Sequence, residues 1–531
     1  YIIKNTLLSG IFFLSFFVSP AASQPSVEWA RRYKVHNDSK DVVFYVKTDG
    51  FGNCYSAGLS TDSTTGLFIS NIVIFKFSPS GEELWQIRTN GFHFSAFTGF
   101  LIDAEGSSYI SGTGGNMGGT SYTTMKYNSS GTLQWAKEYT GNLNSSNSPN
   151  AVFRDGSGNI VVTGNTREGA NTDIATVKYS STGEEMWVRR FSEPGNFYQS
   201  GNAVCTDNGG NVYVTGTSTI NNQTTELITI KYDPLGQQQW VKRYSGSAGL
   251  NAEGNKIITD NLNNIYVIGK SRETGSGYDV CIIKYDPSGN QLWLRIVDIP
   301  GSENVYIWEF ISDGAGNLII HGQGGLIGNF LLKYTSTGDN LWIRDVTEDM
   351  YHMDMDNKGN IYIAAHDQES AYHILKYTPQ GTRQWKVAYP DTVGKDNIIF
   401  TLSLDNAGNI FTGGAIGISG TEIECVTVKF SDPTGIQQIN EGVPGTFSLS
   451  QNYPNPFNPT TTIKFDITEE SSVKVVIYDM LGREIYTLVN ETMIAGSYKV
   501  DFNASDLASG TYFYRINAGD FSDIKKMILI K

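Results

Sequence analysis

Residues 284–293 read Lys-Tyr-Asp-Pro-Ser-Gly-Asn-Gln-Leu-Trp, and this phrase decides the fold because it recurs along the chain. A Lys followed by an aromatic residue, a short turn with Gly, and a Trp nine residues after the Lys occur together seven times. The Lys–Trp pairs are Lys76–Trp85, Lys126–Trp135, Lys178–Trp187, Lys231–Trp240, Lys284–Trp293, Lys333–Trp342 and Lys376–Trp385. A period near 50 residues indicates an array of similar supersecondary units.

A second phrase accompanies the first. It consists of an Asp, an Asn four residues later in most copies, and a run rich in Val, Ile, Thr and Tyr that usually ends in Gly. β-Branched and aromatic residues favour strands, and Asp, Asn, Gly and Pro favour tight turns. Each unit therefore reads as four strands, a to d. The eight copies of this phrase start at Asp49, Asp103, Asp155, Asp207, Asp260, Asp313, Asp356 and Asp405.

Repeated four-stranded units of this length predict an all-β fold, a β-propeller in which each unit forms one blade. The eighth unit ends at Lys429-Phe430 with no Trp after it, whereas an extra strand of type d, residues 29–33, precedes the first unit. We expect this amino-terminal strand to complete the eighth blade and leave the ring without an open edge. The sequence thus predicts eight blades over residues 24–430, with seven as the alternative because the seventh unit is short.

Loop lengths distinguish the two faces of the predicted ring. The a–b and c–d turns keep a constant length, whereas the b–c and d–a connections vary. Functional variation concentrates in loops on a rigid scaffold, so we expect the binding face to be that of the b–c and d–a connections. The repeats resemble a bacterial β-propeller repeat family of secreted proteins between residues 29 and 430. That resemblance implies a fold far more than a function.

The amino terminus has the three-part pattern of a secretory signal peptide. Lys4 precedes an apolar run over residues 11–18, and small residues follow. The run is short compared with the roughly 20 residues of a membrane-spanning helix. We expect cleavage between Ser23 and Gln24, which would remove residues 1–23 and leave no membrane span in the mature chain.

The repeat stops after Phe430, and a linker over residues 431–445 leads to a different module at residues 446–531. Its alternating strands and Gly or Asn turns predict a small immunoglobulin-like β-sandwich. The module resembles the type A sorting domain of the type IX secretion system through Asn452, Pro454, Pro456, Phe457, Asn458, Pro459, Gly482, Gly510, Tyr512, Lys525 and Lys526. The resemblance implies the secretion machinery as a partner and a location outside a diderm bacterium or on its outer surface.

Composition restricts the partners and the chemistry. The formal net charge of −14 disfavours nucleic acid, because phosphate binding requires a basic face. The four Cys lie far apart in sequence, so we expect buried free thiols and no metal or redox motif. We expect no cofactor. The spacing of the four weak candidates for metal ligands matches no metal motif; they are His352, Asp354, His366 and His373.

The sequence favours a secreted or cell-surface propeller that binds a glycan or a protein without catalysis. The alternative is a hydrolase or lyase that degrades extracellular polymers, with its site on the loop face or in the central channel. A remote alternative is a quinoprotein-like dehydrogenase, because the blades of those enzymes also carry a Gly-x-x-x-Trp phrase. No linear motif assigns a catalytic residue, so whether the protein is an enzyme stays open.

Overall fold

The computed structural model divides the chain into two compact units, residues 25–432 and residues 433–531. The predicted cleavage site at Ser23 and Gln24 lies outside the described residues. Those residues form strands and one short 3-10 helix at Ser247–Gly249. The structure describes residues 25–33, 40–61, 70–89, 94–116, 119–141, 145–193, 198–220, 224–275, 277–299, 301, 303–366, 372–389, 397–419, 422–431, 437–440, 444–504 and 507–530.

The strands of the first unit repeat in the order a, b, c, d. The a strands are β2 (Lys40–Thr48), β6 (Phe94–Ile102), β10 (Ser146–Arg154), β14 (Gln199–Thr206), β18 (Ala252–Thr259), β22 (Val305–Ser312), β26 (Asp349–Met355) and β30 (Asn397–Leu404). The b strands are β3 (Cys54–Thr61), β7 (Ser108–Asn116), β11 (Ile160–Glu168), β15 (Val212–Ile220), β19 (Ile265–Arg272), β23 (Leu318–Gly324), β27 (Ile361–His366) and β31 (Ile410–Ser419).

The c and d strands follow in the same order. The c strands are β4 (Ser70–Phe77), β8 (Gly119–Tyr127), β12 (Asn171–Tyr179), β16 (Thr224–Tyr232), β20 (Tyr278–Tyr285), β24 (Gly328–Tyr334), β28 (Tyr372–Tyr377) and β32 (Glu422–Ser431). The d strands are β5 (Glu83–Arg88), β9 (Leu133–Tyr139), β13 (Glu185–Phe191), β17 (Gln238–Tyr244), β21 (Gln291–Val297), β25 (Asn340–Val346), β29 (Arg383–Ala388) and β1 (Ser26–Tyr33).

Pairing among these strands is antiparallel, and each group forms a four-stranded sheet in the order a-b-c-d. The first two groups are joined into one larger sheet through the single pair Ser70–Phe94. The last group is completed by β1, which pairs with β32. We interpret the eight groups of described strands as eight blades.

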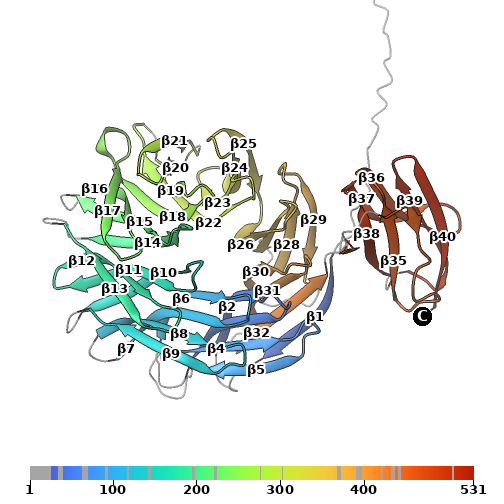
Figure 1. The fold of residues 1–531 in the computed structure, drawn as a ribbon, viewed down its shortest axis with the longest axis horizontal. Helices are drawn as coiled ribbons and strands as arrows, with labels where there is room; N and C mark the ends of the chain where they lie inside the picture. Colours follow the sequence, from blue (N-terminus) through green and yellow to red (C-terminus); the bar gives the residue numbers. More distant parts are fainter. Residues whose placement is uncertain are drawn as a thin grey trace, which may run out of the picture. The chain divides into compact units, whose positions relative to one another are not determined.

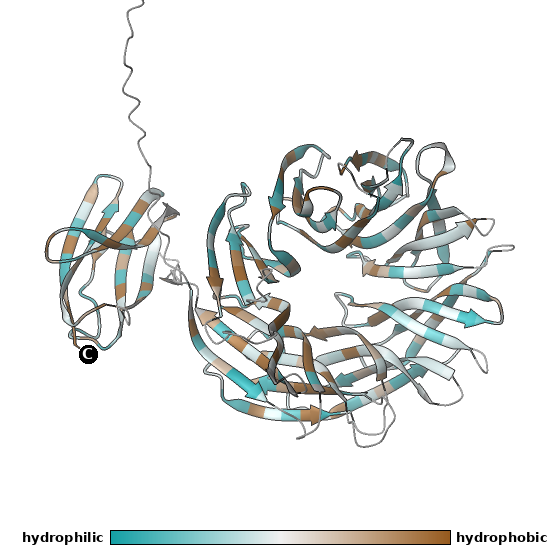
Figure 2. Ribbon diagram, turned by 180° about the vertical axis from the view of Figure 1, so that it is seen from behind, coloured by the Kyte–Doolittle hydropathy of each residue, from teal (hydrophilic) through white to brown (hydrophobic). Residues whose placement is uncertain are grey.

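The a strands lie innermost and surround the axis of the ring (Figure 1). Each of them contacts the a strand of the next group, from β2 to β6 and onward to β30, which contacts β2 again. Sheets arranged radially in this way form a β-propeller, as the repeat predicts. The b and c strands are buried on both sides, as in β20, because each sheet packs between two others. Figure 2 shows apolar residues along these strands.

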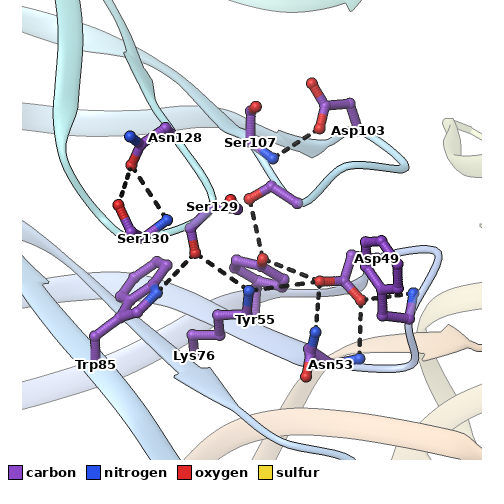
Figure 3. Close-up of polar contacts among 12 residues, drawn as sticks. Asp49, Asn53, Tyr55, Lys76, Trp85, Asp103, Ser107, Asn128, Ser129 and Ser130 are labelled. Carbon is purple, nitrogen blue, oxygen red and sulfur yellow. Dashed lines mark hydrogen bonds and ion pairs between the residues drawn. The ribbon is translucent and has the colours of Figure 1, made fainter.

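One network of hydrogen bonds explains the repeated Lys–Trp phrase (Figure 3). The Lys76 ammonium and the Trp85 indole both donate to the carbonyl oxygen of Ser129 in the c–d turn of the next blade, at 3.2 and 3.0 Å. Lys76 and Trp85 also lie directly opposite each other on β4 and β5. Because both side chains reach one acceptor, the spacing between them is fixed.

The turn Gly completes this contact. A side chain at Gly183 would meet the ring of Trp135 at 2.6 Å, because that indole packs directly on the backbone of the next blade. Gly183 also has a φ of +85°, which an L side chain rarely adopts. The turn therefore requires Gly for two independent reasons.

The second unit is a sandwich of two four-stranded sheets, β33-β38-β35-β34 and β37-β36-β39-β40, that share one apolar core. Strand β33 falls in the segment predicted as a linker, and it pairs with β38 at the edge of the sheet. The alternating pattern of a single short edge strand is too weak to distinguish from a linker in sequence. The strands are β33 (Gln437–Asn440), β34 (Ser448–Leu449), β35 (Thr460–Ile467), β36 (Ser471–Tyr478), β37 (Glu484–Met493), β38 (Gly496–Asn503), β39 (Gly510–Ala518) and β40 (Phe521–Leu529).

Candidate functional site

Each a strand carries a β-bulge at an equivalent position, and the bulge leaves one residue of the innermost strand without a partner on strand b. A bulge redirects side chains locally, which makes these positions candidates for function. β6 has a second bulge, at Ser95. The eight bulged residues at the equivalent position, in chain order, are Phe44, Thr98, Asn150, Asn202, Asn255, Trp308, Tyr351 and Phe400.

Several of these side chains have structural roles. Asn150 donates from Nδ2 to the carbonyl oxygen of Gly201 at 3.0 Å, and Asn202 donates in the same way to that of Gly254 at 2.8 Å. Each amide thus links one inner strand to the next. The ring of Phe400 packs against the ring of Phe44, with their centroids 5.4 Å apart.

Trp308 differs from the other bulged residues. Its side chain is 48% exposed on the innermost strand β22, and Tyr306 on the same strand is 49% exposed. Their rings stack with a centroid distance of 5.8 Å and an interplanar angle of 18°. The two residues, hereafter the stacked pair, present a broad aromatic surface to solvent. Exposed aromatic surface of this kind is typical of binding sites.

Polar groups lie beside the stacked pair, near the ends of strands that face the b–c and d–a connections. The Lys270 ammonium lies 5.9 Å from the ring centroid of Tyr306 and 4.8 Å from that of Tyr278. It forms an ion pair with Glu253 at 3.4 Å and donates to Asn304 Oδ1 at 3.1 Å. The side of the ring predicted to bind therefore presents aromatic surface and charged groups together.

Ionisable residues follow the bulges on neighbouring inner strands. Lys256, Glu309 and His352 occupy the position directly after the bulge on β18, β22 and β26. Glu309 Oε2 lies 3.6 Å from His352 Nε2, and both side chains are about one quarter exposed or less, at 24% and 21%. Lys47 of β2 acts electrostatically on both Glu309 and His352, and we call these four residues the axial cluster.

The axial cluster contains a charged carboxylate and a neutral imidazole. Burial would raise the pKa of Glu309, but the positive charges of Lys256 and Lys47 outweigh this effect and lower the pKa. Burial lowers the pKa of His352, although the charge of Glu309 acts in the opposite direction. His352 is therefore an uncharged partner of Glu309 at neutral pH.

A further histidine lies behind the cluster. His321 on β23 is directly opposite Glu309 across the two strands, and it is completely buried. Burial lowers the pKa of His321 to about 4, so the ring is neutral. Neither ring nitrogen has a hydrogen-bond partner among the described residues.

The structure does not bring the four weak metal candidates together into one site. Asp354 Oδ2 accepts a hydrogen bond from the backbone of Leu404 at 2.9 Å, and His366 lies 3.3 Å from the Tyr351 hydroxyl. His373 is buried on β28, and only His352 joins the axial cluster. Within the described ranges, no group of three or more His, Cys, Asp or Glu is placed to hold a metal ion.

Sequence reasoning missed the stacked pair, Glu309 and Lys256. One signal was available, since eight of the nine Trp belong to the Lys–Trp phrase or its amino-terminal counterpart, and Trp308 alone does not. The position of a bulge depends on pairing between strands, so the sequence did not indicate which residues would lie next to Trp308.

The residues of the carboxyl-terminal phrase mostly stabilise the sandwich. Asn452 Nδ2 donates to Thr461 Oγ1 at 2.9 Å, and Phe457 is buried in the core. The Tyr512 hydroxyl donates to the carbonyl of Ala508 at 2.8 Å. Three residues of the phrase are exposed, namely Pro454, Pro456 and Asn458. The carbonyl oxygen of Pro459 accepts a hydrogen bond from the backbone N–H of Ala504, and Gly482 has a φ of +76°. Gly510 begins β39, and the two lysines, Lys525 and Lys526, lie on β40.

Comparison with solved structures gives similarities at low identity. The BP39L lectin from Burkholderia pseudomallei is 10% identical, with 66% of this chain and 99% of the lectin covered and a TM-score of 0.42. The β-propeller domain of the Trilobed protease from Pyrococcus furiosus is 10% identical, with 67% and 98% covered and a TM-score of 0.41. No curated protein matches this chain.

A family model gives a direct assignment for the second unit. Residues 451–531 match the secretion system C-terminal sorting domain, which confirms the resemblance predicted from the sequence. None of the described residues forms a helix that is long and apolar enough to cross a membrane. The chain is therefore a β-propeller protein with a type IX secretion system sorting domain at its carboxyl end, which directs it to the cell surface or the medium.

Proposed function

We propose that the propeller is a carbohydrate-binding module that acts outside the cell without catalysis. The stacked pair is the observation that supports this proposal most strongly, because two half-exposed rings on an innermost strand form a flat apolar surface. The C–H face of a pyranose ring packs against such a surface, while its hydroxyl groups need donors and acceptors at the edge. Lys270, Glu253 and Asn304 supply these groups beside the stacked pair.

A glycan array with the full mature chain tests this proposal. We expect retention of at least one glycan class, and loss of that retention in Trp308→Ala. The matched control is Phe51→Ala, since Phe51 is also an exposed aromatic residue, at 73%, but lies in an a–b turn. Retention of no glycan, or equal retention by wild type and Trp308→Ala, would contradict the proposal.

A catalytic alternative is favoured by one observation, the Glu309–His352 pair in the axial cluster. A carboxylate close to a neutral imidazole, here at 3.6 Å, supplies two groups of the kind used in general acid–base chemistry. Release of fragments from a retained polymer, abolished in Glu309→Gln, would support a hydrolase or lyase. Retention without released fragments supports the binding module.

A further inference from the structure

The hairpin between β36 and β37 of the sorting domain ends in two large apolar side chains that lie in solvent. Met480 is 72% exposed and Leu481 is 79% exposed. We call these two residues the apolar tip. An exposed side chain of this size contributes little to folding, because its apolar surface remains in water.

The turn that carries the apolar tip is rigid. Asp479 Oδ1 accepts from the backbone N–H of Leu481 at 2.8 Å and of Arg483 at 2.9 Å. Asp479 Oδ2 accepts from Arg483 Nε at 2.6 Å, and Gly482 has a φ of +76°. These hydrogen bonds thus fix the backbone that carries the apolar tip.

The same turn occurs in the propeller without an apolar tip. Asp155 Oδ1 accepts from the N–H groups of Ser157 and Asn159, and Asp155 Oδ2 accepts from the Asn159 amide, as Asp479 does with its own partners. None of the eight a–b turns has large apolar residues at both middle positions. These pairs are Gly50-Phe51, Ala104-Glu105, Gly156-Ser157, Asn208-Gly209, Asn261-Leu262, Gly314-Ala315, Asn357-Lys358 and Asn406-Ala407. The turn geometry therefore does not require Met480 and Leu481.

We propose that the apolar tip is the contact by which this sorting domain docks into a narrow apolar recess on a protein of the secretion machinery. The recognised role of the domain selects this occupant, because residues 451–531 match a secretion system sorting domain and the tip lies within that match. Two side chains on a rigid hairpin suit a recess, since the backbone that carries them is already ordered and only their rotamers become fixed on binding.

Secretion of the full chain from a bacterium with a type IX system tests the proposal. The double variant Met480→Ser/Leu481→Ser should decrease the protein found outside the cells by about tenfold or more, since it removes two apolar contacts that docking would bury. The swap Met480→Leu/Leu481→Met keeps the apolar character and should be secreted normally. The matched control is Ile494→Ser, because Ile494 is also exposed in the sorting domain, at 60%.

Thermal melting of each purified variant separates docking from folding. We expect the melting temperature of the double variant to equal that of the wild type. Should it be lower, the single change Leu481→Lys replaces the double variant as the test. Normal secretion of the variant that keeps the wild-type melting temperature would overturn the proposal. An equal secretion defect in Ile494→Ser would overturn it as well. A change in oligomeric state with normal secretion would instead assign the tip to contacts between copies of this chain, which also overturns it.

Discussion

Trp29 on β1 lies directly opposite Lys429 on β32, so the first and last strands of the propeller belong to one sheet. Both side chains donate to the carbonyl oxygen of Pro79, at 3.1 and 3.2 Å. Pro79 lies in the c–d turn of the first blade, so the same contact that joins other neighbouring blades also joins the two ends of the ring.

Removal of this contact should destabilise the whole propeller. Trp29 is 7% exposed, and we expect Trp29→Ala to decrease the free energy of unfolding by about 3 to 5 kcal/mol, as for other buried Trp residues. Urea denaturation measures this change. Trp308→Ala is the control, since Trp308 is half-exposed and should change stability little; equal losses in both variants would contradict a special role for ring closure.

The turn carboxylates predict how stability depends on pH. Burial alone would raise the pKa of Asp155, but hydrogen bonds from Asn159 and from Lys178, whose ammonium lies 3.0 Å away, lower it. Because the pKa of Asp155 is lower in the folded state, its ionised form stabilises the fold. This contribution to the free energy of unfolding is fully present above the unfolded-state pKa of about 3.9, and it is lost as the pH falls through the folded-state pKa.

Urea unfolding of the wild type between pH 2 and pH 5 measures this dependence. The free energy of unfolding should decrease below about pH 4, and the decrease should be smaller in Asp155→Asn. Asp339→Asn serves as the control, because Asp339 is exposed in the c–d turn between β24 and β25. A stability that does not change below pH 4, or an unchanged slope in Asp155→Asn, would refute the interpretation.

The four Cys should be inert in the folded protein. Cys54, Cys205, Cys281 and Cys425 are free and buried, and burial raises the pKa of each thiol well above its usual value. Because the thiolate is the reactive form, we expect no reaction with Ellman's reagent before unfolding and four reactive thiols afterwards. Rapid modification of any thiol in the native protein would be inconsistent with this core.

The axial cluster predicts the titration of His352. The charge of Glu309 raises the pKa of His352 against the larger effect of burial. Replacement Glu309→Gln should therefore lower the pKa of His352 further, which NMR titration of the imidazole can measure. Glu253→Gln is the control, because Glu253 pairs with Lys270 instead. An unchanged or raised pKa in Glu309→Gln would show that the two groups do not interact.

Much of the fold could be predicted from the sequence repeat, because the Lys–Trp spacing reflects a contact present in most blades. Lys284 and Trp293 both donate to Ser336 in the next blade, as Lys231 and Trp240 do to Pro287. Local spacing can reveal such an arrangement because both donors lie on one hairpin. The strand within the predicted linker could not be recognised from local spacing, since β33 pairs with β38, which lies far away in sequence.

The candidate site was much less predictable. His352 was named only as a weak metal candidate. Its neighbour Glu309 lies on a different blade, and the two residues meet only because two inner strands are neighbours in the ring. His366 and His373 are close to His352 in sequence and take other partners or positions. Sequence proximity therefore grouped His352 with residues that lie elsewhere, whereas contacts between blades determine its neighbours in the cluster.

The binding of a carbohydrate by the stacked pair is the central claim. Isothermal titration of the mature chain with a glycan retained on the array tests it most directly. We predict saturable binding by the wild type and by Phe51→Ala, with at least about tenfold weaker binding by Trp308→Ala, as for a central aromatic contact. Equal affinities of the wild type and Trp308→Ala would contradict the claim.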